Sequence, residues 1–154
     1  MLKYVDTKVV FAEIPDEITL AINISGCPCN CKGCHSAYLA EDIGVELSEE
    51  KLRELIDSNQ GITCVAFMGG DAEPCEIRHL AMFIKVVYPK LKVAWYSGRE
   101  KLHSCVKLNL HNFDYIKLGP YIEELGPLSS RTTNQRLYKI EDGVLTDITN
   151  KFWK

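Results

Sequence analysis

Four cysteines and a histidine lie close together in the segment 25–35, which reads Ser-Gly-Cys-Pro-Cys-Asn-Cys-Lys-Gly-Cys-His. Three of them, Cys27, Cys31 and Cys34, have the spacing C-x3-C-x2-C. A short loop can turn several thiolates of this spacing towards one metal centre, and cysteine thiolates are the ligands of iron–sulfur clusters. If only three thiolates bind a 4Fe–4S cluster, one iron keeps an open position where a substrate can bind. The segment therefore predicts a metal-binding loop that can serve catalysis.

A structural zinc site is the main alternative for the same loop, because zinc is commonly held by four cysteines or by three cysteines and a histidine. The candidate ligands are Cys27, Cys29, Cys31, Cys34 and His35. Structural zinc sites usually take two ligand pairs from separate segments. The remaining cysteines form no such pair in the sequence: Cys64, Cys75 and Cys105. We therefore favour an iron–sulfur cluster and interpret Cys29 as a loop residue outside the coordination set.

The cysteine motif, which follows a strand-like apolar run, resembles the signature of the radical S-adenosylmethionine (radical SAM) enzymes. More narrowly, Gly26-Cys27…Cys31-Lys32-Gly33-Cys34-His35 is similar to the anaerobic ribonucleoside-triphosphate reductase activating proteins, which are glycyl-radical activating enzymes. This resemblance implies that Cys27, Cys31 and Cys34 hold a 4Fe–4S cluster, and that the methionine part of S-adenosyl-L-methionine chelates the fourth iron. It also implies that Gly33, Cys34 and His35 contact the cofactor.

Two later turns extend the resemblance. In radical SAM enzymes a Gly-Gly-Glu-Pro-like segment binds the amino group of the cofactor, and the segment 69–74, Gly-Gly-Asp-Ala-Glu-Pro, resembles it with two extra residues before the proline. Gly69 and Gly70 let the backbone approach a ligand closely. Asp71 and Glu73 are both candidates for the carboxylate that meets the amino group, and we favour Asp71. Ser97, in Trp-Tyr-Ser-Gly at 95–98, is similar to the family's next strand end and can hydrogen-bond the ribose or the methionine carboxylate.

Two segments near the end of the chain carry the narrower resemblance. The stretch 114–121, Asp-Tyr-Ile-Lys-Leu-Gly-Pro-Tyr, is similar to the family's Asp…Gly-Pro-Phe/Tyr stretch, and Asn134-Gln135-Arg136 matches part of its Asn-Gln-Arg segment. Lys117 can serve a carboxylate, although a lysine on an amphipathic strand is the simpler interpretation. His79, His103 and His111 have no partner pattern, so we interpret them as surface or helix-face residues.

Strands and helices that alternate along the chain must position these residues. Apolar alternation or continuous apolar runs predict strands, and a serine cap at Ser48 and a proline at Pro74 predict helix starts. The expected strands are 18–25, 62–68, 91–96 and 113–118, with a hairpin formed by 136–140 and 144–148 around Asp142-Gly143. A further weak helix is expected near Arg99.

This alternation predicts βαβ units and a parallel sheet. A complete eight-stranded barrel takes about 250 residues, so 154 residues are too few. The expected fold is therefore α/β: an incomplete, open β/α barrel of the radical SAM type with a mainly parallel sheet. The cysteine loop and both turns then lie at the carboxyl ends of the strands, where such sheets bind ligands.

Length and composition indicate a single radical SAM-like domain over residues 1–154. The net charge of −3 gives no electrostatic reason to expect nucleic acid or an anionic membrane as a partner. No apolar run approaches the ~20 residues of a membrane span. Seven cysteines without a signal peptide favour a reducing compartment, so we expect a cytoplasmic protein.

The resemblance implies an oxidoreductase that cleaves S-adenosyl-L-methionine reductively and generates a 5′-deoxyadenosyl radical. That radical abstracts hydrogen from a glycine of the large subunit of anaerobic ribonucleotide reductase and leaves a glycyl radical. An electron donor such as flavodoxin or ferredoxin is implied as a second partner. The alternatives are an activator of another glycyl-radical enzyme, a radical SAM enzyme acting on a small molecule, and a non-enzymatic zinc or iron–sulfur binding module.

Overall fold

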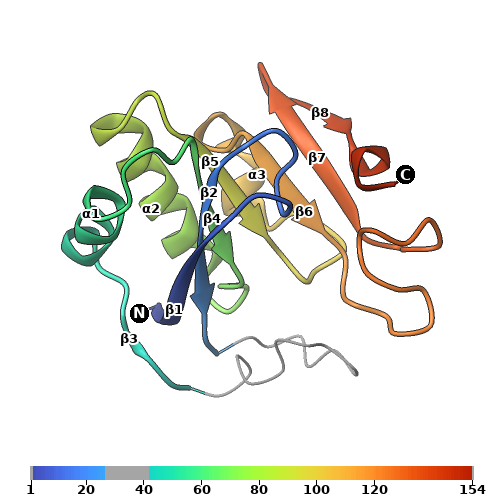
Figure 1. Ribbon diagram of the computed structural model, residues 1–154, viewed down its shortest axis with the longest axis horizontal. Helices are drawn as coiled ribbons and strands as arrows, with labels where there is room; N and C mark the ends of the chain where they lie inside the picture. The colour runs from blue at the N-terminus through green and yellow to red at the C-terminus, as the bar shows by residue number, and fades with distance from the viewer. Residues whose placement is uncertain (1, 27–41, 154) are drawn as a thin grey trace.

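The computed structural model describes residues 2–26 and 42–153 and contains one sheet flanked by helices (Figure 1). The strands are β1 (Lys3–Val10), β2 (Thr19–Ile24), β3 (Val45–Glu46), β4 (Cys64–Met68), β5 (Lys92–Tyr96), β6 (Tyr115–Leu118), β7 (Arg136–Glu141) and β8 (Val144–Asp147). The helices are α1 (Glu49–Asp57), α2 (Pro74–Val87) and α3 (Ser104–Lys107), with the 3-10 helices η2 (Leu110–Asn112) and η3 (Thr149–Phe152).

The sheet is mixed and open, with the strand order β3-β1-β2-β4-β5-β6-β7-β8. Only the central strands β2, β4, β5 and β6 run parallel to one another. At one side β1 pairs antiparallel with both β2 and β3, and at the other β7 pairs antiparallel with β6 and β8. The prediction of an incomplete β/α barrel of the radical SAM type with a mainly parallel sheet is therefore wrong.

The physical reason lies in the connections at the two sides of the sheet. A β/α barrel needs a crossover helix between every pair of neighbouring strands. Here only residues 11–18 connect β1 to β2, and only residues 142–143 connect β7 to β8; both connections are too short for a crossover, so both pairs are antiparallel. The described chain has three α-helices, and α3 has only four residues. The C-terminal hairpin was expected, but the antiparallel pairing of β1 with β2 and of β7 with β6 leaves the β/α alternation confined to the central part of the chain.

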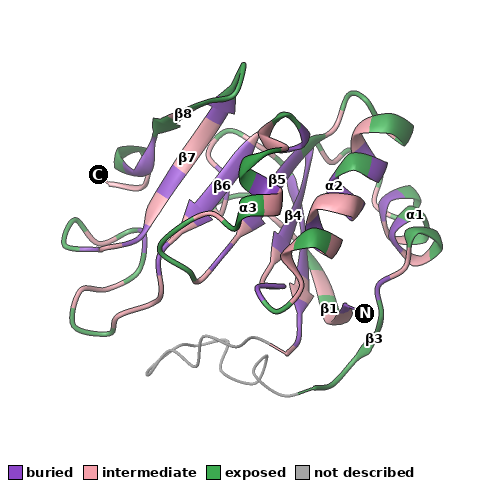
Figure 2. Ribbon diagram, turned by 180° about the vertical axis from the view of Figure 1, so that it is seen from behind, coloured by how far each residue is buried: buried purple, intermediate pink, exposed green. Residues whose placement is uncertain are grey.

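Both faces of the sheet are buried, but by different partners. α2 and α3 lie on the face that is turned towards the viewer in Figure 2, and the strands present large apolar side chains to the helices. Those fully buried strand residues include Leu20, Ile22, Val65, Phe67, Val93 and Trp95. The alternate residues, among them Cys64, Ala66 and Ala94, pack on the other face against Ile14 and Leu128 from loops. The period-2 alternation of strands thus divides the core in two.

Several local predictions are confirmed. Ser48 caps α1 by accepting a hydrogen bond from the backbone N–H of Lys51 at 3.1 Å, and α2 begins at Pro74. Asp142 and Gly143 both have positive φ (52° and 75°), as the expected two-residue hairpin turn requires. The helix expected near Arg99 begins only at Ser104.

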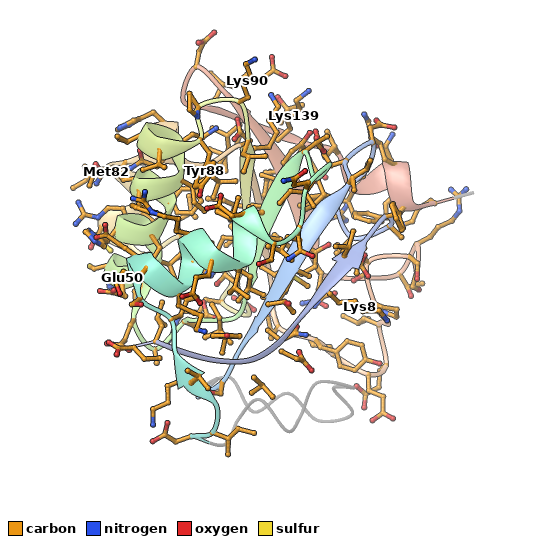
Figure 3. All side chains as sticks on the ribbon, turned by 60° about the vertical axis from the view of Figure 1, so that its left-hand side comes forward. Lys8, Glu50, Met82, Tyr88, Lys90 and Lys139 are labelled. Atoms are coloured by element: carbon orange, nitrogen blue, oxygen red, sulfur yellow. The ribbon has the colours of Figure 1, made fainter. Side chains whose placement is uncertain are left out.

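A hydrogen bond connects the C-terminal ends of α1 and α2. The Tyr88 hydroxyl, just past α2, donates a hydrogen bond to Asp57 Oδ1 at the end of α1 at 2.7 Å. Met82 of α2 and Glu50 of α1 are exposed on the outer side of this layer (Figure 3). No helix in the described part of the chain has the length and apolar character needed to cross a bilayer.

Candidate functional site

The predicted cluster loop lies outside the described residues, together with the predicted cluster ligands Cys27, Cys31 and Cys34 and the predicted cofactor contacts Gly33 and His35. The residues on either side of it are described. Ser25, directly after β2, donates its hydroxyl to the carbonyl oxygen of Ile43 and to that of Lys3 at 3.3 Å. The chain before the predicted loop and the chain that follows it, at Ile43, are therefore held together at the carboxyl end of β2.

The turns that follow β4, β5 and β6 meet at this same edge, because these strands run parallel to β2. After β4, Gly69 accepts a hydrogen bond from Trp95 Nε1 at 2.7 Å and donates its N–H to the carbonyl of Tyr96 at 3.1 Å. After β5, the N–H of Ser97 donates to the carbonyl of Lys117 in β6 at 2.9 Å. We call this side, from Ser25 to Gly119, the carboxyl edge.

Gly70 fits its place only because it lacks a side chain. Its φ is +93°, which L-residues with a Cβ rarely adopt, and a Cβ would stand 2.6 Å from Ile77 Cδ1. The turn therefore lies tightly against the start of α2. A larger residue at this position would push the turn away from α2.

A cavity of about 190 Å³ opens between the ends of the predicted loop and this turn. Its described lining residues are Leu2, Lys3, Ser25, Gly26, Asp42, Gly70, Ala72 and Glu73. The last residue described before the predicted loop thus shares a cavity with the Gly-Gly turn. Three charged residues line it, Lys3, Asp42 and Glu73, and Lys3 Nζ is ion-paired with Asp42 Oδ1 at 3.0 Å.

Asp71 is buried beside this cavity, with 3% of its surface exposed. The hydroxyl of Ser97 donates to Asp71 Oδ1, and the N–H of Gly98 donates to Oδ2 at 2.8 Å. The N–H of Arg99 in turn donates to the Ser97 hydroxyl at 3.2 Å. Asp71 therefore ties the turn after β4 to the turn after β5.

The structure brings four of the predicted cofactor contacts together: Gly69, Gly70, Asp71 and Ser97. Only Gly70 of these lines the cavity, whereas Glu73, the second candidate carboxylate, lines it too. Asp71 and Ser97 do not line it, and they are hydrogen-bonded to each other. Their direct contact with a cofactor stays a prediction.

Lys117 and Asp114, both on or next to β6, are held internally. Lys117 is 7% exposed and donates to the carbonyl of Gly119 at 3.1 Å, with its ammonium 5.6 Å from the centre of the Tyr96 ring. Asp114 lies at the opposite end of β6, where it accepts hydrogen bonds from Lys85 Nζ and from the N–H of Val93 at 2.9 Å. Asp114 is therefore remote from the carboxyl edge.

The predicted Asn-Gln-Arg segment packs against the turn after β6. Asn134 Nδ2 donates to the carbonyl of Pro120 at 3.1 Å, and Gln135 Nε2 lies 3.4 Å from that of Gly119. Asn134 Oδ1 is buried without a hydrogen-bond partner among the described residues. Since a buried carbonyl oxygen normally accepts a hydrogen bond, this end of the carboxyl edge has one unused acceptor.

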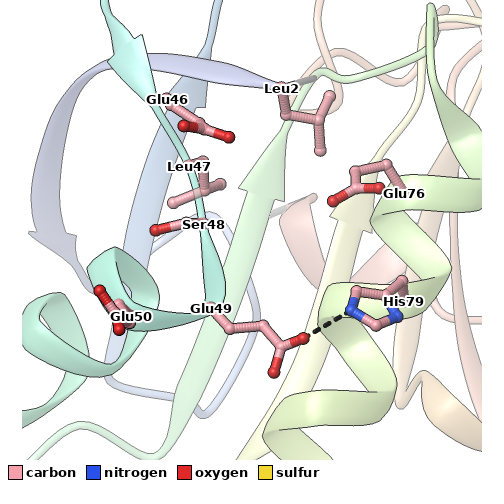
Figure 4. Close-up of a pocket in the computed structure, with 8 residues that line it drawn as sticks. All are labelled: Leu2, Glu46, Leu47, Ser48, Glu49, Glu50, Glu76 and His79. Carbon is pink, nitrogen blue, oxygen red and sulfur yellow. Dashed lines mark hydrogen bonds and ion pairs between the residues drawn. The ribbon is translucent and has the colours of Figure 1, made fainter.

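A larger hollow of about 470 Å³ lies between the start of α1 and α2, next to Leu2 (Figure 4). Most of its polar side chains are acidic: Glu46, Glu49, Glu50 and Glu76. Glu49 is hydrogen-bonded to His79 Nε2 at 2.7 Å across the hollow. Its negative charge disfavours an anionic ligand, and it contains none of the predicted site residues.

Two cysteines and a histidine that have no partner pattern in the sequence lie together in the structure. Cys75 at the start of α2 and His103 and Cys105 at the start of α3 have ligand atoms within 4.8 Å of one another. The only sequence hint is the local His-x-Cys spacing, because Cys75 joins through the packing of α2 on α3. Cys64, by contrast, is fully buried, and burial raises the pKa of its thiol to about 12, as expected for inert packing.

Comparison with known proteins agrees with the predicted cluster. Searches of curated proteins and of solved structures found no significant match. A family model described as a 4Fe–4S single cluster domain matches residues 18–140, from the residue before β2 to the second-last residue of β7. The matched range includes the cysteine motif and every predicted site residue, and it covers most of the chain. The chain therefore belongs to the family of 4Fe–4S single cluster domains.

Proposed function

We propose that this protein is a radical SAM activase of a glycyl-radical enzyme. When bound, the reduced 4Fe–4S cluster supplies one electron that cleaves S-adenosyl-L-methionine into methionine and a 5′-deoxyadenosyl radical, which takes a hydrogen atom from a glycine of the partner. The cysteine spacing supports three protein ligands from Cys27, Cys31 and Cys34 and a fourth iron open to the cofactor. The family match supports the cluster itself.

The observation that carries this proposal is the cavity shared by Gly26, Gly70 and Glu73. It joins the residue directly before the cysteine motif to the turn that resembles the cofactor-binding segment of radical SAM enzymes. A cofactor chelated at an open iron must have its amino and carboxylate groups within reach of neighbouring protein groups. The cavity provides such groups next to the start of the motif.

Within this proposal the chain's own residues bind and position the cofactor. The Glu73 carboxylate at the cavity wall accepts hydrogen bonds from the amino group. The Lys3 ammonium, which is ion-paired with the exposed Asp42, attracts the cofactor carboxylate in exchange for this pair. Gly70 allows the backbone to approach closely. Asp71 and Ser97 act as positioning residues without lining the cavity, because the hydrogen bond between them fixes the turn after β4.

The proposed partners follow from the activity. The protein substrate is the large subunit of anaerobic ribonucleotide reductase, whose glycine must come to the carboxyl edge. The electron donor is a small redox protein such as flavodoxin or ferredoxin. The proposed location, the cytoplasm, is consistent with both.

The test is turnover of the reduced, cluster-loaded protein without oxygen, with methionine and 5′-deoxyadenosine measured as products. We expect both in equal amounts, and Glu73→Gln should raise the Kd for the cofactor about tenfold, since one charge-assisted hydrogen bond is worth about 1.5–3 kcal/mol. Glu76→Gln, in the neighbouring acidic hollow, is the matched control and should leave the Kd unchanged. Absence of both products from protein with an intact cluster would contradict the proposal.

An electron carrier is the second candidate, because the matching family model is described by its single cluster alone. A carrier would exchange electrons with the donor and yet leave S-adenosyl-L-methionine intact. The same assay separates the two, since only the activase consumes the cofactor.

A further inference from the structure

A second cluster of metal-ligating side chains lies where α2 and α3 pack together. Cys75 belongs to the first turn of α2, His103 is the N-cap residue of α3, and Cys105 belongs to the first turn of α3. Their ligand atoms all lie within 4.8 Å of one another. We propose that Cys75, His103 and Cys105 bind a zinc ion at a site distinct from the 4Fe–4S cluster.

The spacing of the three ligand atoms is close to that of a tetrahedral zinc site. With Zn–S bonds of about 2.3 Å and Zn–N bonds of about 2.0–2.1 Å, neighbouring ligand atoms stand roughly 3.5–3.8 Å apart. His103 Nδ1 and Cys105 Sγ are 3.1 Å apart, and no pair is more than 4.8 Å apart. Side-chain rotations that move these atoms by roughly 1 Å therefore suffice to bring all three to one ion.

The chemistry of the three groups selects a thiophilic metal. Two thiolates and a neutral imidazole suit zinc and do not suit magnesium or calcium, which prefer oxygen ligands. Two thiolate charges also neutralise the charge of a divalent ion. Burial and the neighbouring Cys75 thiol raise the pKa of Cys105 to about 11. Metal binding has to displace this proton, so affinity should increase with pH.

Arg78, one turn after Cys75 on α2, adds a positive charge next to the thiols. Its guanidinium lowers the pKa of Cys105, against the larger effect of burial. Its Nε–H is buried and has no hydrogen-bond partner within residues 2–26 and 42–153. A buried N–H normally finds an acceptor, and a metal-bound thiolate would be such an acceptor.

The site is accessible and incomplete. Cys75 and His103 are exposed and Cys105 is partly buried, so an ion can enter from solvent. His103 Nδ1 accepts the N–H of Cys105 at 3.2 Å, and coordination through this nitrogen would replace that hydrogen bond. Three protein ligands leave the fourth position to water or to an external ligand, as in catalytic zinc sites.

The experiment counts metals in the cluster-loaded protein, prepared without oxygen in a non-thiol reductant. One equivalent of zinc chloride is added, unbound metal is removed, and zinc and iron are measured by mass spectrometry. We expect about one zinc per chain with iron unchanged. Cys75→Ser and His103→Asn should each lower zinc retention at least tenfold. Asparagine retains an oxygen that can cap α3, so the loss would not reflect an uncapped helix.

Two controls separate this site from the cluster loop. His111→Asn and Cys64→Ala should retain zinc, and the triple variant Cys27→Ser, Cys31→Ser, Cys34→Ser should still bind it without any iron. Cobalt added in place of zinc should give thiolate-to-metal charge-transfer absorption that Cys75→Ser weakens. Equal zinc retention in wild type and Cys75→Ser, zinc binding that disappears in the triple variant, or thiols that only form a Cys75–Cys105 disulfide would overturn the proposal.

Discussion

Two aspartates at opposite edges of the sheet show how the same strands serve two purposes. Asp71 lies at the carboxyl edge and accepts hydrogen bonds from Ser97 and Gly98, which belong to turns. Asp114 lies at the opposite side of the sheet, where the parallel strands begin, which we call the amino edge. It accepts hydrogen bonds from Lys85 of α2 and from the N–H of Val93 in β5. Both carboxylates accept hydrogen bonds. Those of Asp71 connect two turns next to a cavity, whereas those of Asp114 connect α2 to the sheet.

The difference teaches that buried hydrogen bonding alone does not identify a functional carboxylate. The amino edge is closed by an ion pair and by Cys64, whose thiol is fully buried. The carboxyl edge has glycine turns and a cavity next to the cysteine motif. Mutations at the carboxyl edge should therefore alter both stability and cofactor binding, whereas mutations at the amino edge should alter stability alone.

Asp71→Ala should have the largest effect. It removes the acceptor of two hydrogen bonds and leaves the Ser97 hydroxyl and the Gly98 N–H without their partner, which should lower the free energy of unfolding by about 3 kcal/mol. Urea unfolding measures this loss, and cofactor binding should weaken in the same variant. Asp42→Ala is the control, because Asp42 is 81% exposed and its ion pair with Lys3 is worth about 0.5 kcal/mol. A similar small loss in both variants would contradict the role of Asp71.

Gly70→Ala should cost about 2 kcal/mol, because it adds backbone strain and a methyl group 2.6 Å from Ile77 Cδ1. Gly143→Ala is matched to it, since Gly143 also has positive φ but has nothing within 4 Å of the added carbon. The difference between the two in thermal or urea unfolding isolates the packing of the turn on α2. Equal losses would mean that the turn has room for a side chain.

Asp114→Asn should lower the free energy of unfolding by about 1.5 kcal/mol, because it weakens a partly buried ion pair with Lys85. Calorimetry or urea unfolding measures the loss. The cluster spectrum and the Kd for S-adenosyl-L-methionine should not change. A weaker Kd without further loss of stability would break the distinction between the two edges.

The titration of the Cys64 thiol at alkaline pH should give the smallest effect. Burial raises the pKa of Cys64 from 9.0 to about 12, so the unfolded chain loses this proton first as pH rises. The stabilisation is complete below pH 9 and decreases above it, by about 1.4 kcal/mol at pH 10. Burial also raises the pKa values of Tyr96 and Tyr115, which acts in the same direction. In Cys64→Ala the free energy of unfolding should decrease less steeply between pH 9 and pH 10. An unchanged slope would contradict the burial of the Cys64 thiol away from water.

Local features were predictable from the sequence because neighbouring residues determine them. Ser48 followed by acidic residues marks the start of α1, and Asp142-Gly143 marks the hairpin of β7 and β8. The apolar run that became β4 and the Gly-Gly turn after it were also placed correctly.

Features that depend on distant pairing were not predictable. β1 mixes polar with apolar residues, and nothing in its local sequence shows that it pairs antiparallel with both β2 and β3, so the barrel prediction failed. Which of Asp71 and Glu73 lines the cavity depends on the conformation of one turn. Cys75 meets Cys105 only after α2 packs on α3.

The most direct test of the proposed function is the electron paramagnetic resonance spectrum of the reduced cluster, recorded without oxygen before and after addition of S-adenosyl-L-methionine. The proposed activase has the cofactor at an open iron beside the carboxyl edge, so its 4Fe–4S signal should change on addition, and less so in Glu73→Gln at the same cofactor concentration. A 4Fe–4S signal that stays the same at saturating cofactor would contradict cofactor binding at the cluster and would favour an electron carrier.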